Sequence, residues 1–215
     1  MALHLLIVAS LVSGTVFEPL VQDPHLGETA ATEKPPWEFS GTAFYSDPPG
    51  SEDARTTAIL YGDRGPLHLE LRYNYEDLDT ASAFFGWAFS GGDSLAYTVT
   101  PMVGVVGGDT DGVAPGLLLD VAWRRFAWYV ESEYLFDAHD SSDDFFYSWS
   151  TLTYAFTDWL SAGTVAERNK VVDTDFEVQW GLALELQLKR IGVAVYTYNL
   201  GDDDDYTVVS LGASV

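Results

Sequence analysis

The segment Leu67-His68-Leu69-Glu70-Leu71-Arg72-Tyr73-Asn74-Tyr75 alternates strictly between apolar and polar side chains. Every odd position is aliphatic or aromatic, and every even position is polar. Residues 176–189 repeat the pattern, with a face of Phe, Val, Trp and Leu opposite a face rich in Glu and Gln. Because successive residues of a strand point to opposite faces, both segments predict β-strands whose faces meet different environments.

The period of two extends from Trp37 to the end of the chain and predicts an all-β fold. Twelve segments fit a strand, and ten is the fallback because 55–63 and 205–215 alternate least clearly. Most segments approach the 9–11 residues of a transmembrane strand, and an even number suits a closed antiparallel barrel. The predicted strands are 37–46, 55–63, 66–76, 80–90, 94–106, 113–124, 126–137, 145–157, 159–168, 175–189, 190–199 and 205–215.

The predicted connections alternate between short and long, and the charges follow the same division. Short turns fall at 63–65, 91–93, 124–125, 157–158 and 189–190, and they hold five of the ten Lys and Arg residues. The longer connections carry runs of acidic residues, as at 143–144 and 202–205. Short turns on one side and longer loops on the other are typical of up-and-down transmembrane barrels, with the turns in the periplasm and the loops outside.

Composition excludes several other classes of protein. The 215 residues include 33 acidic and 10 basic side chains, for a net charge of −23, which argues against phosphate-backbone binding. The chain contains no cysteine, so disulfides and thiolate chemistry are excluded. No stretch beyond residue 20 holds 18 consecutive apolar residues, so the sequence predicts no transmembrane helix there.

Aromatic residues gather near both ends of the predicted strands. Two rings of Trp and Tyr around an aliphatic band are expected at the two membrane interfaces of a barrel. The ring at the short turns would contain Trp37, Tyr61, Trp87, Tyr97, Trp123, Trp128, Tyr154 and Trp159. The ring at the long loops would contain Tyr45, Tyr73, Tyr75, Tyr134, Phe136, Phe145, Tyr196 and Tyr206.

With this pattern, residues 37–215 resemble the outer-membrane β-barrel superfamily in the size range of small porins. The resemblance is one of architecture and brings no catalytic or binding motif with it. It implies a location in the bacterial outer membrane and insertion by the barrel-assembly machinery. These barrels usually finish on an aromatic residue, whereas this sequence ends in Ser214-Val215.

The segment before the barrel is expected to serve export. Residues 3–12 form a short apolar core and small residues follow at Ser13-Gly14, so residues 1–14 are interpreted as a signal peptide. Residues 15–36 are interpreted as a periplasmic leader, and residues 37–215 as the barrel.

If the apolar face meets lipid, the polar face lines the lumen. The residues expected to line it are Glu38, His68, Glu70, Arg72, Asn74, Asp120, Tyr129, Glu131, Glu133, Glu177, Gln179, Glu185, Gln187 and Lys189. Their excess of carboxylates suggests a preference for cations. Twelve strands lie between barrels filled by side chains and barrels with an open channel, so Arg72 and Lys189 could equally close the lumen through ion pairs.

Two functions remain open at this stage. The first is a small porin-like channel for passive passage of small hydrophilic solutes. The alternative is a non-conducting structural or surface-binding barrel that acts through its acidic outer loops. An enzyme is not expected, because His68 is the one histidine in a predicted strand and no nucleophile is tied to it.

Few partners follow from the sequence. No cofactor is expected. Asp202, Asp203, Asp204 and Asp205 are weak candidates for binding a divalent cation, because they lack the spacing of a calcium loop. The expected partners are outer-membrane lipid and lipopolysaccharide around a barrel that is expected to be monomeric, together with small solutes or divalent cations.

Overall fold

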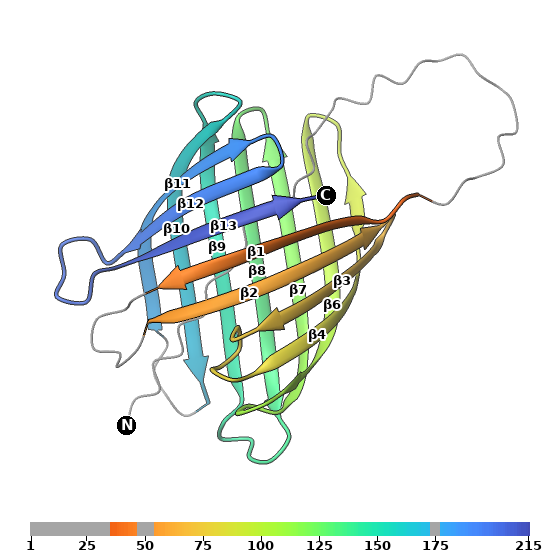
Figure 1. Ribbon diagram of the computed structural model, residues 1–215, viewed down its shortest axis with the longest axis vertical. Helices are drawn as coiled ribbons and strands as arrows, with labels where there is room; N and C mark the ends of the chain where they lie inside the picture. Colours follow the sequence, from red (N-terminus) through yellow and green to blue (C-terminus); the bar gives the residue numbers. More distant parts are fainter. Residues whose placement is uncertain (1–34, 47–53, 173–176) are drawn as a thin grey trace, which may run out of the picture.

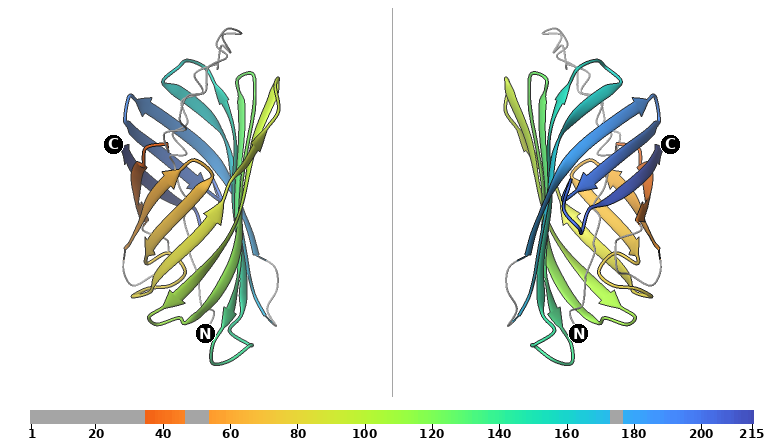
Figure 2. Two further views of the ribbon diagram at one scale, coloured as in Figure 1. Left: turned by 90° about the vertical axis from the view of Figure 1, so that its right-hand side faces the viewer. Right: turned by 90° about the vertical axis from the view of Figure 1, so that its left-hand side faces the viewer.

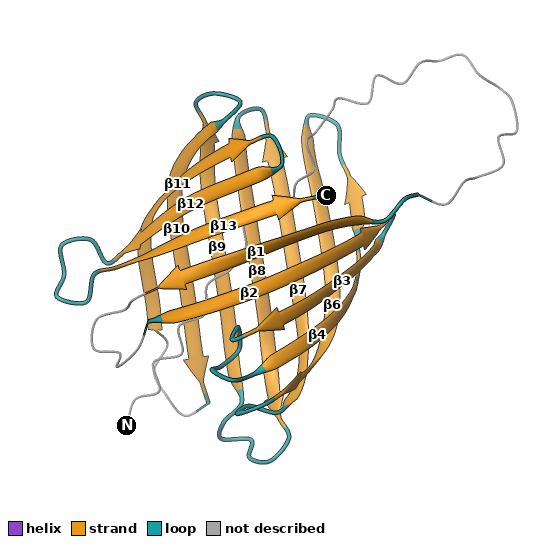
Figure 3. Cartoon of the chain, in the orientation of Figure 1, coloured by secondary structure: helices purple, strands orange, loops and turns teal. Residues whose placement is uncertain are grey.

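The computed structural model describes residues 35–46, 54–172 and 177–215 (Figure 1). The expected signal peptide and most of the expected leader lie outside these residues. All regular structure in the described part of the chain is β-strand (Figure 3), which confirms the predicted all-β class. No helix in that part is long and apolar enough to cross a membrane.

The strands follow the predicted segments closely, including the two with the weakest alternation. They are β1 (Glu38–Ser46), β2 (Arg55–Arg64), β3 (Leu67–Tyr73), β4 (Ala81–Trp87), β5 (Phe89–Gly91), β6 (Leu95–Gly107), β7 (Gly112–Trp123), β8 (Phe126–Asp137), β9 (Phe145–Ala155), β10 (Leu160–Val171), β11 (Glu177–Leu188), β12 (Ile191–Tyr198) and β13 (Tyr206–Ser214).

Apart from β4 and β5, which both pair with β6, successive strands pair antiparallel with each other, and β1 pairs with β13. The ring of strands closes completely because β4 and β6 also pair. Both β4 and β5 lie along β6, so β5 continues the line of β4 and the barrel has 12 strands around its wall. Figure 2 shows the steeply inclined strands of one wall and the more upright strands of the other. The predicted up-and-down barrel is confirmed.

The gap between β4 and β5 has a local cause. Pairing with β6 runs up to Gly86 opposite Met102 and resumes at Phe89 opposite Val99. Pro101 lies opposite the gap and has no backbone N–H to donate to a neighbouring strand. The sequence predicted one strand over 80–90, and this proline divides it in two.

The end of β3 also differs from the prediction. The alternating pattern extended the strand to residue 76, but it ends at Tyr73 because Asn74 adopts a positive φ of 54°. The side chain of Asn74 donates to the carbonyl of Thr56 at 3.1 Å and accepts from the backbone N–H of Asp79 at 2.9 Å. Asn74 therefore shapes the β3–β4 loop, and the chain after it turns into the barrel.

Five of the aromatic residues assigned to the interface rings lie inside the barrel instead. Each occupies an inward position of its strand or loop, because the register places it on the same side as buried neighbours. These residues are Tyr61, Tyr75, Phe145, Tyr196 and Tyr206, all less than a tenth exposed. Trp37, Trp87, Trp123, Trp128 and Trp159 face outward at the short-turn end, as predicted.

The exterior is dominated by large apolar side chains. Leu60, Leu71, Phe85, Val105 and Leu182 are each more than half exposed, and they lie on the outward faces of different strands. A continuous apolar surface around a closed barrel needs lipid to cover it. The apolar exterior and the rim of tryptophans are those of a barrel that spans a membrane.

The short turns and the long loops occupy opposite ends of the barrel (Figure 1). The β2–β3 turn uses Gly65 at φ 59°, while Arg124 and Lys189 adopt φ 56° in the β7–β8 and β11–β12 turns. Positive φ is what the tightest hairpin turns require. The acidic connections, including the 199–205 loop, lie at the other end.

Candidate functional site

The centre of the barrel holds one arginine surrounded by carboxylates. Arg72 points inward from β3 and is completely buried at its side chain. Its Nε donates to Glu70 Oε2 at 2.6 Å and its Nη1 donates to Glu133 Oε2 at 2.9 Å. Its Nη2 lies 2.8 Å from Glu131 Oε1, and Glu76 Oε1 is 3.7 Å from Nη1. Glu70, Arg72, Glu76, Glu131 and Glu133 are called the Arg72 cluster below.

The Arg72 cluster joins distant parts of the chain. Glu70 and Arg72 come from β3, Glu131 and Glu133 come from β8 on the opposite wall, and Glu76 comes from the β3–β4 loop. Each of the five residues is 2% exposed or less. Removing one partner of a buried ion pair leaves an uncompensated charge, so this cluster holds the two walls together across the lumen.

His68 extends the network toward the short turns. Its Nδ1 is 2.7 Å from Asp63 Oδ1, and its Nε2 is 2.7 Å from Glu70 Oε1. Both ring nitrogens therefore face carboxylate oxygens. This geometry suits an imidazolium, since only the protonated ring has an N–H at both positions.

Aromatic rings pack around the charges and occupy part of the remaining interior. The Cζ atom of Arg72 lies 4.2 Å from the ring centre of Tyr75 and 4.1 Å from that of Phe84. The hydroxyl of Tyr75 donates to Glu131 Oε1 at 2.7 Å, and Trp149 Nε1 donates to the hydroxyl of Tyr198 at 2.9 Å. At this level of the barrel the side chains pack against one another, so any passage must run through or around them.

A second set of charges lies toward the long loops. Arg55 on β2 is 3.6 Å from Asp77 in the β3–β4 loop. Glu167 on β10 is 1% exposed and accepts a hydrogen bond from Asn169 Nδ2 at 2.9 Å. Beyond them, a hollow of about 240 Å³ opens at the loop end. Its lining residues are Asp77, Asp109, Thr110, Asp137, Asp143, Phe145 and Val171.

The residues expected to line the lumen fall into three groups. His68, Glu70, Arg72, Glu131 and Glu133 are buried in the central network. Asp120, Tyr129, Gln179 and Glu185 are partly buried on inward positions of their strands, and Gln179 accepts a hydrogen bond from the hydroxyl of Tyr206.

The third group lies at the ends of the barrel. Glu38 and Gln187 are exposed near the short turns, and Gln187 Nε2 donates to the carbonyl of Lys189 within its turn. Arg72 and Lys189 were the two cations expected to form ion pairs that could close the lumen. Arg72 lies in the centre of the barrel, whereas Lys189 is exposed and does not supply such a pair. Asn74 shapes the loop described above. Glu177 opens β11, and its side chain is not among those described.

Sequence reasoning missed several interior residues. Arg55 and Glu167 lie in strands where alanine, glycine, serine and threonine blur the alternation. Tyr75 and Glu76 follow the end of β3, so no strand pattern could place them inside. Tyr147, Trp149 and Tyr198 lie on buried faces that carry aromatic residues in place of polar ones. For the missed residues that lie in strands, the signal that could have found them is their spacing of two, four or six residues from a neighbour already known to face inward.

The aspartates proposed for divalent cations lie in the exposed 199–205 loop. Asp204 accepts a hydrogen bond from Asn199 Nδ2 at 3.0 Å. Within the described ranges, no group of three or more His, Asp or Glu side chains is arranged to hold a metal ion. The structure therefore gives no support to a metal site at Asp202, Asp203, Asp204 and Asp205.

Comparison with known proteins identifies relatives by fold. No family model and no curated protein matches the chain. Among solved structures, the KdgM porin is similar with a TM-score of 0.58 at 13% identity, covering 82% of this chain and 99% of that one. The NanC porin is similar with a TM-score of 0.57 at 12% identity, covering 82% and 98%. KdgM has also been solved in complex with a disordered oligogalacturonate. The chain therefore has the barrel fold of small outer-membrane porins.

Proposed function

We propose that this barrel is a narrow porin-like channel that passes small hydrophilic solutes and prefers cations to anions. The observation that carries the proposal is the excess of carboxylates inside a barrel of the porin fold. The inward-facing acidic residues are Asp63, Glu70, Glu76, Asp120, Glu131, Glu133, Glu167 and Glu185, against Arg55, His68 and Arg72.

Charge of one sign along a lumen selects ions by the field it creates. The low-dielectric wall strengthens that field, and the acidic hollow at the loop end would concentrate cations before they enter. An anionic solute would be repelled by the acidic hollow at the loop end and again by the carboxylates inside the lumen. An oligogalacturonate, which the KdgM porin holds in its crystal, is a polyanion and therefore a poor fit for this interior.

The packed centre limits the size of the solute. Trp149, Tyr147 and Glu131 are 1% exposed or less, so passage depends on movement of side chains around the Arg72 cluster. We therefore expect low conductance and slow uptake of solutes larger than an amino acid. No residue is assigned a catalytic role in this proposal.

Swelling of proteoliposomes tests the proposal with matched solutes. The refolded protein is placed in vesicles and diluted into isosmotic lysine hydrochloride or sodium glutamate. Lysine should enter faster than glutamate, and Glu131→Gln with Glu133→Gln should reduce the difference. Asp158→Asn, in an exposed short turn, should leave it unchanged. Faster entry of glutamate, or no entry of either solute through folded protein, would contradict the proposal.

The same packed centre favours a second candidate, a non-conducting barrel that binds partners through its acidic loops. Deleting residues 202–205 from the exposed β12–β13 loop should then abolish partner binding while the barrel remains intact. This function predicts no swelling in either solute, so the vesicle experiment separates the two candidates.

A further inference from the structure

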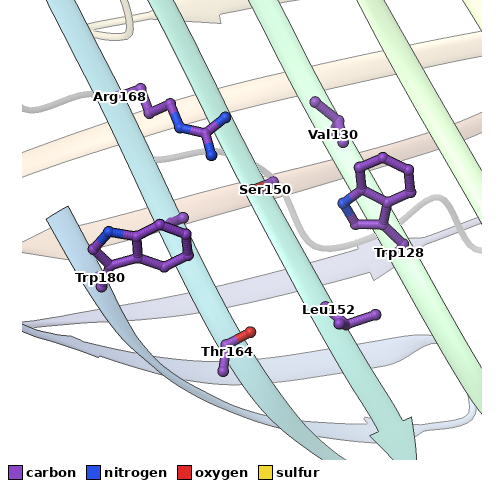
Figure 4. Close-up of a pocket in the computed structure, with 8 residues that line it drawn as sticks. Trp128, Val130, Ser150, Leu152, Thr164, Arg168 and Trp180 are labelled. Atoms are coloured by element: carbon purple, nitrogen blue, oxygen red, sulfur yellow. The ribbon is translucent and has the colours of Figure 1, made fainter. Parts of the chain in front are cut away.

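The outer wall of the barrel contains a hollow at a place where lipid should lie. Its volume is about 270 Å³, and it is formed by the outward faces of β8, β9, β10 and β11 (Figure 4). The lining residues are Trp128, Val130, Ser150, Leu152, Thr164, Ala166, Arg168 and Trp180.

The hollow arises from the strand register. Val130 pairs with Ser150, Ser150 pairs with Ala166, and Ala166 pairs with Trp180, so small residues of the two middle strands lie between larger ones. Thr164 and Leu152 pair in the next row. Many other outward positions carry large apolar residues, as at Leu71, Phe85 and Val105. The small residues leave a recess on the outer surface of the wall between the larger side chains.

A cation lies at one end of the hollow. Arg168 is three residues from the end of β10 at Val171, and therefore near the long loops. Its side chain extends over the hollow in Figure 4, on the side away from the arrowhead of β9. Its Cζ atom is 5.9 Å from the ring centre of Trp180. Within the described ranges, Arg168 has no carboxylate close enough for an ion pair.

Lys170 adds a second cation on the same face of the strand. Residues two apart in a strand project from one side, about 6.6 Å apart along it. Lys170 is exposed, whereas Arg55, the other described cation near the long loops, is buried and lies beside Asp77. The outward basic charge at this end of the described barrel is therefore concentrated on Arg168 and Lys170.

We infer that the hollow and this basic pair bind one phosphorylated glycolipid of the lipid A type from the outer leaflet. An acyl chain lies in the hollow against Ser150, Ala166 and Thr164, and a phosphate binds Arg168 and Lys170. Arginine and lysine side chains near a membrane interface bind phosphate through charge-assisted hydrogen bonds.

Titration with purified bisphosphorylated lipid A tests this site. The refolded protein in a non-ionic detergent is titrated while bound lipid is counted by native mass spectrometry. Wild type should bind one molecule, and Arg168→Gln with Lys170→Gln should weaken binding by at least about tenfold. Tenfold corresponds to about 1.4 kcal/mol, at the low end for hydrogen bonds to a charged group.

Three further arms make the outcome decisive. Ser150→Trp, which fills the hollow, should weaken binding while leaving both cations in place. Arg124→Gln with Arg125→Gln removes two charges at the opposite rim and should leave binding unchanged. Equal loss in that control, or unchanged affinity in the Arg168 and Lys170 variant, would overturn the site. Phosphatidylglycerol binding as tightly as lipid A would overturn its assignment to the outer-leaflet glycolipid.

Discussion

At the scale of single residues, Arg72 has the most consequential position in the barrel. It neutralises carboxylates from both walls, and its guanidinium lies against the rings of Tyr75 and Phe84. Alternation in β3 predicted that Arg72 faces inward, but it could not predict which carboxylates would meet it. Those contacts depend on how β8 lies across the lumen.

Replacing Arg72 should destabilise the barrel strongly. Arg72→Leu leaves several buried carboxylates without a counter-charge, which costs about 3–5 kcal/mol for a broken buried pair. Urea unfolding in lipid vesicles, followed by tryptophan fluorescence, measures the change. Arg190→Gln in an exposed turn should change stability by less than about 0.5 kcal/mol. Part of the lost stability should return when Arg72→Leu is combined with Glu70→Gln, Glu131→Gln and Glu133→Gln, because fewer buried charges then lack a partner. Equal stability of the Arg72→Leu and Arg190→Gln variants would disprove the role given to Arg72.

Gly104 provides the space that Phe84 needs beneath Arg72. A Cβ atom on Gly104 would lie 2.6 Å from Cδ1 of Phe84, which is far closer than atoms can approach. Gly104→Ala should therefore cost about 1–3 kcal/mol, as overpacking of a filled core does. The same urea experiment measures it. Combining Gly104→Ala with Phe84→Leu should recover stability, and a double variant less stable than the sum of the single changes would contradict this packing.

At the scale of elements, the β3–β4 loop sends buried side chains into the barrel. The backbone N–H of Asn74 donates to the carbonyl of Thr80 at 2.8 Å, which closes the base of the loop. Tyr75 and Glu76 are turned into the barrel and completely buried, while Leu78 is 49% exposed. The loop therefore contributes side chains to the packed centre around Arg72, although it connects its strands at the long-loop end.

Removing the inserted side chains should widen the channel. Tyr75→Ala with Glu76→Ala is expected to raise single-channel conductance by about twofold or more, because conduction is limited by the narrowest section of a pore. Recording in planar bilayers measures the step size. Leu78→Ala in the same loop should leave the conductance unchanged. An identical step size in the double variant would show that the loop does not limit passage.

The β8–β9 loop has a carboxylate, Asp140, whose pKa is lowered by hydrogen bonds within the loop. The backbone N–H and the hydroxyl of Ser142 donate to Asp140 Oδ1 at 3.0 and 2.8 Å, and these bonds lower the pKa of Asp140 below its usual value. Because the folded pKa is lowered, the linked stability is present above the ordinary aspartate pKa and is lost as pH falls through the lowered one. An NMR titration of the Asp140 carboxyl should show this low midpoint, and Ser142→Ala should raise it. A midpoint at the ordinary value in wild type would contradict the contact.

Strand positions could be predicted from the sequence because alternation is a local property. The register of β11, with Val178, Trp180 and Leu182 outward, follows directly from the period of two. Aromatic residues were placed less well, since Tyr suits both a membrane interface and a packed interior. Tyr196 and Tyr206 were assigned to the rim and are buried, because the sequence shows neither the curvature nor the width of the lumen.

At the scale of the whole molecule, the barrel combines an apolar exterior with an interior in which acidic groups outnumber basic ones. Acidic residues of the described chain lie in the long loops and the lumen, while five of the ten basic residues of the sequence lie at the short turns. This distribution links the fold to the proposed cation preference. Its two walls are connected by the strand ladder and by the Arg72 cluster across the lumen.

The closed ladder predicts heat-modifiable behaviour. The refolded protein should migrate differently on a denaturing gel before and after boiling, because pairing of β1 with β13 and of β4 with β6 closes the strands into a ring. Circular dichroism of the unboiled sample should be rich in β-structure. A single mobility together with solubility in the absence of detergent would contradict the closed membrane barrel.

The reversal potential of the folded protein in a planar bilayer under a KCl gradient tests the central claim most directly. The account predicts discrete small conductance steps and a reversal potential with the sign of the K⁺ equilibrium potential. Glu131→Gln with Glu133→Gln should move that potential toward zero. A reversal potential with the sign expected for Cl⁻, or no steps from protein shown to be folded, would contradict a cation-preferring channel.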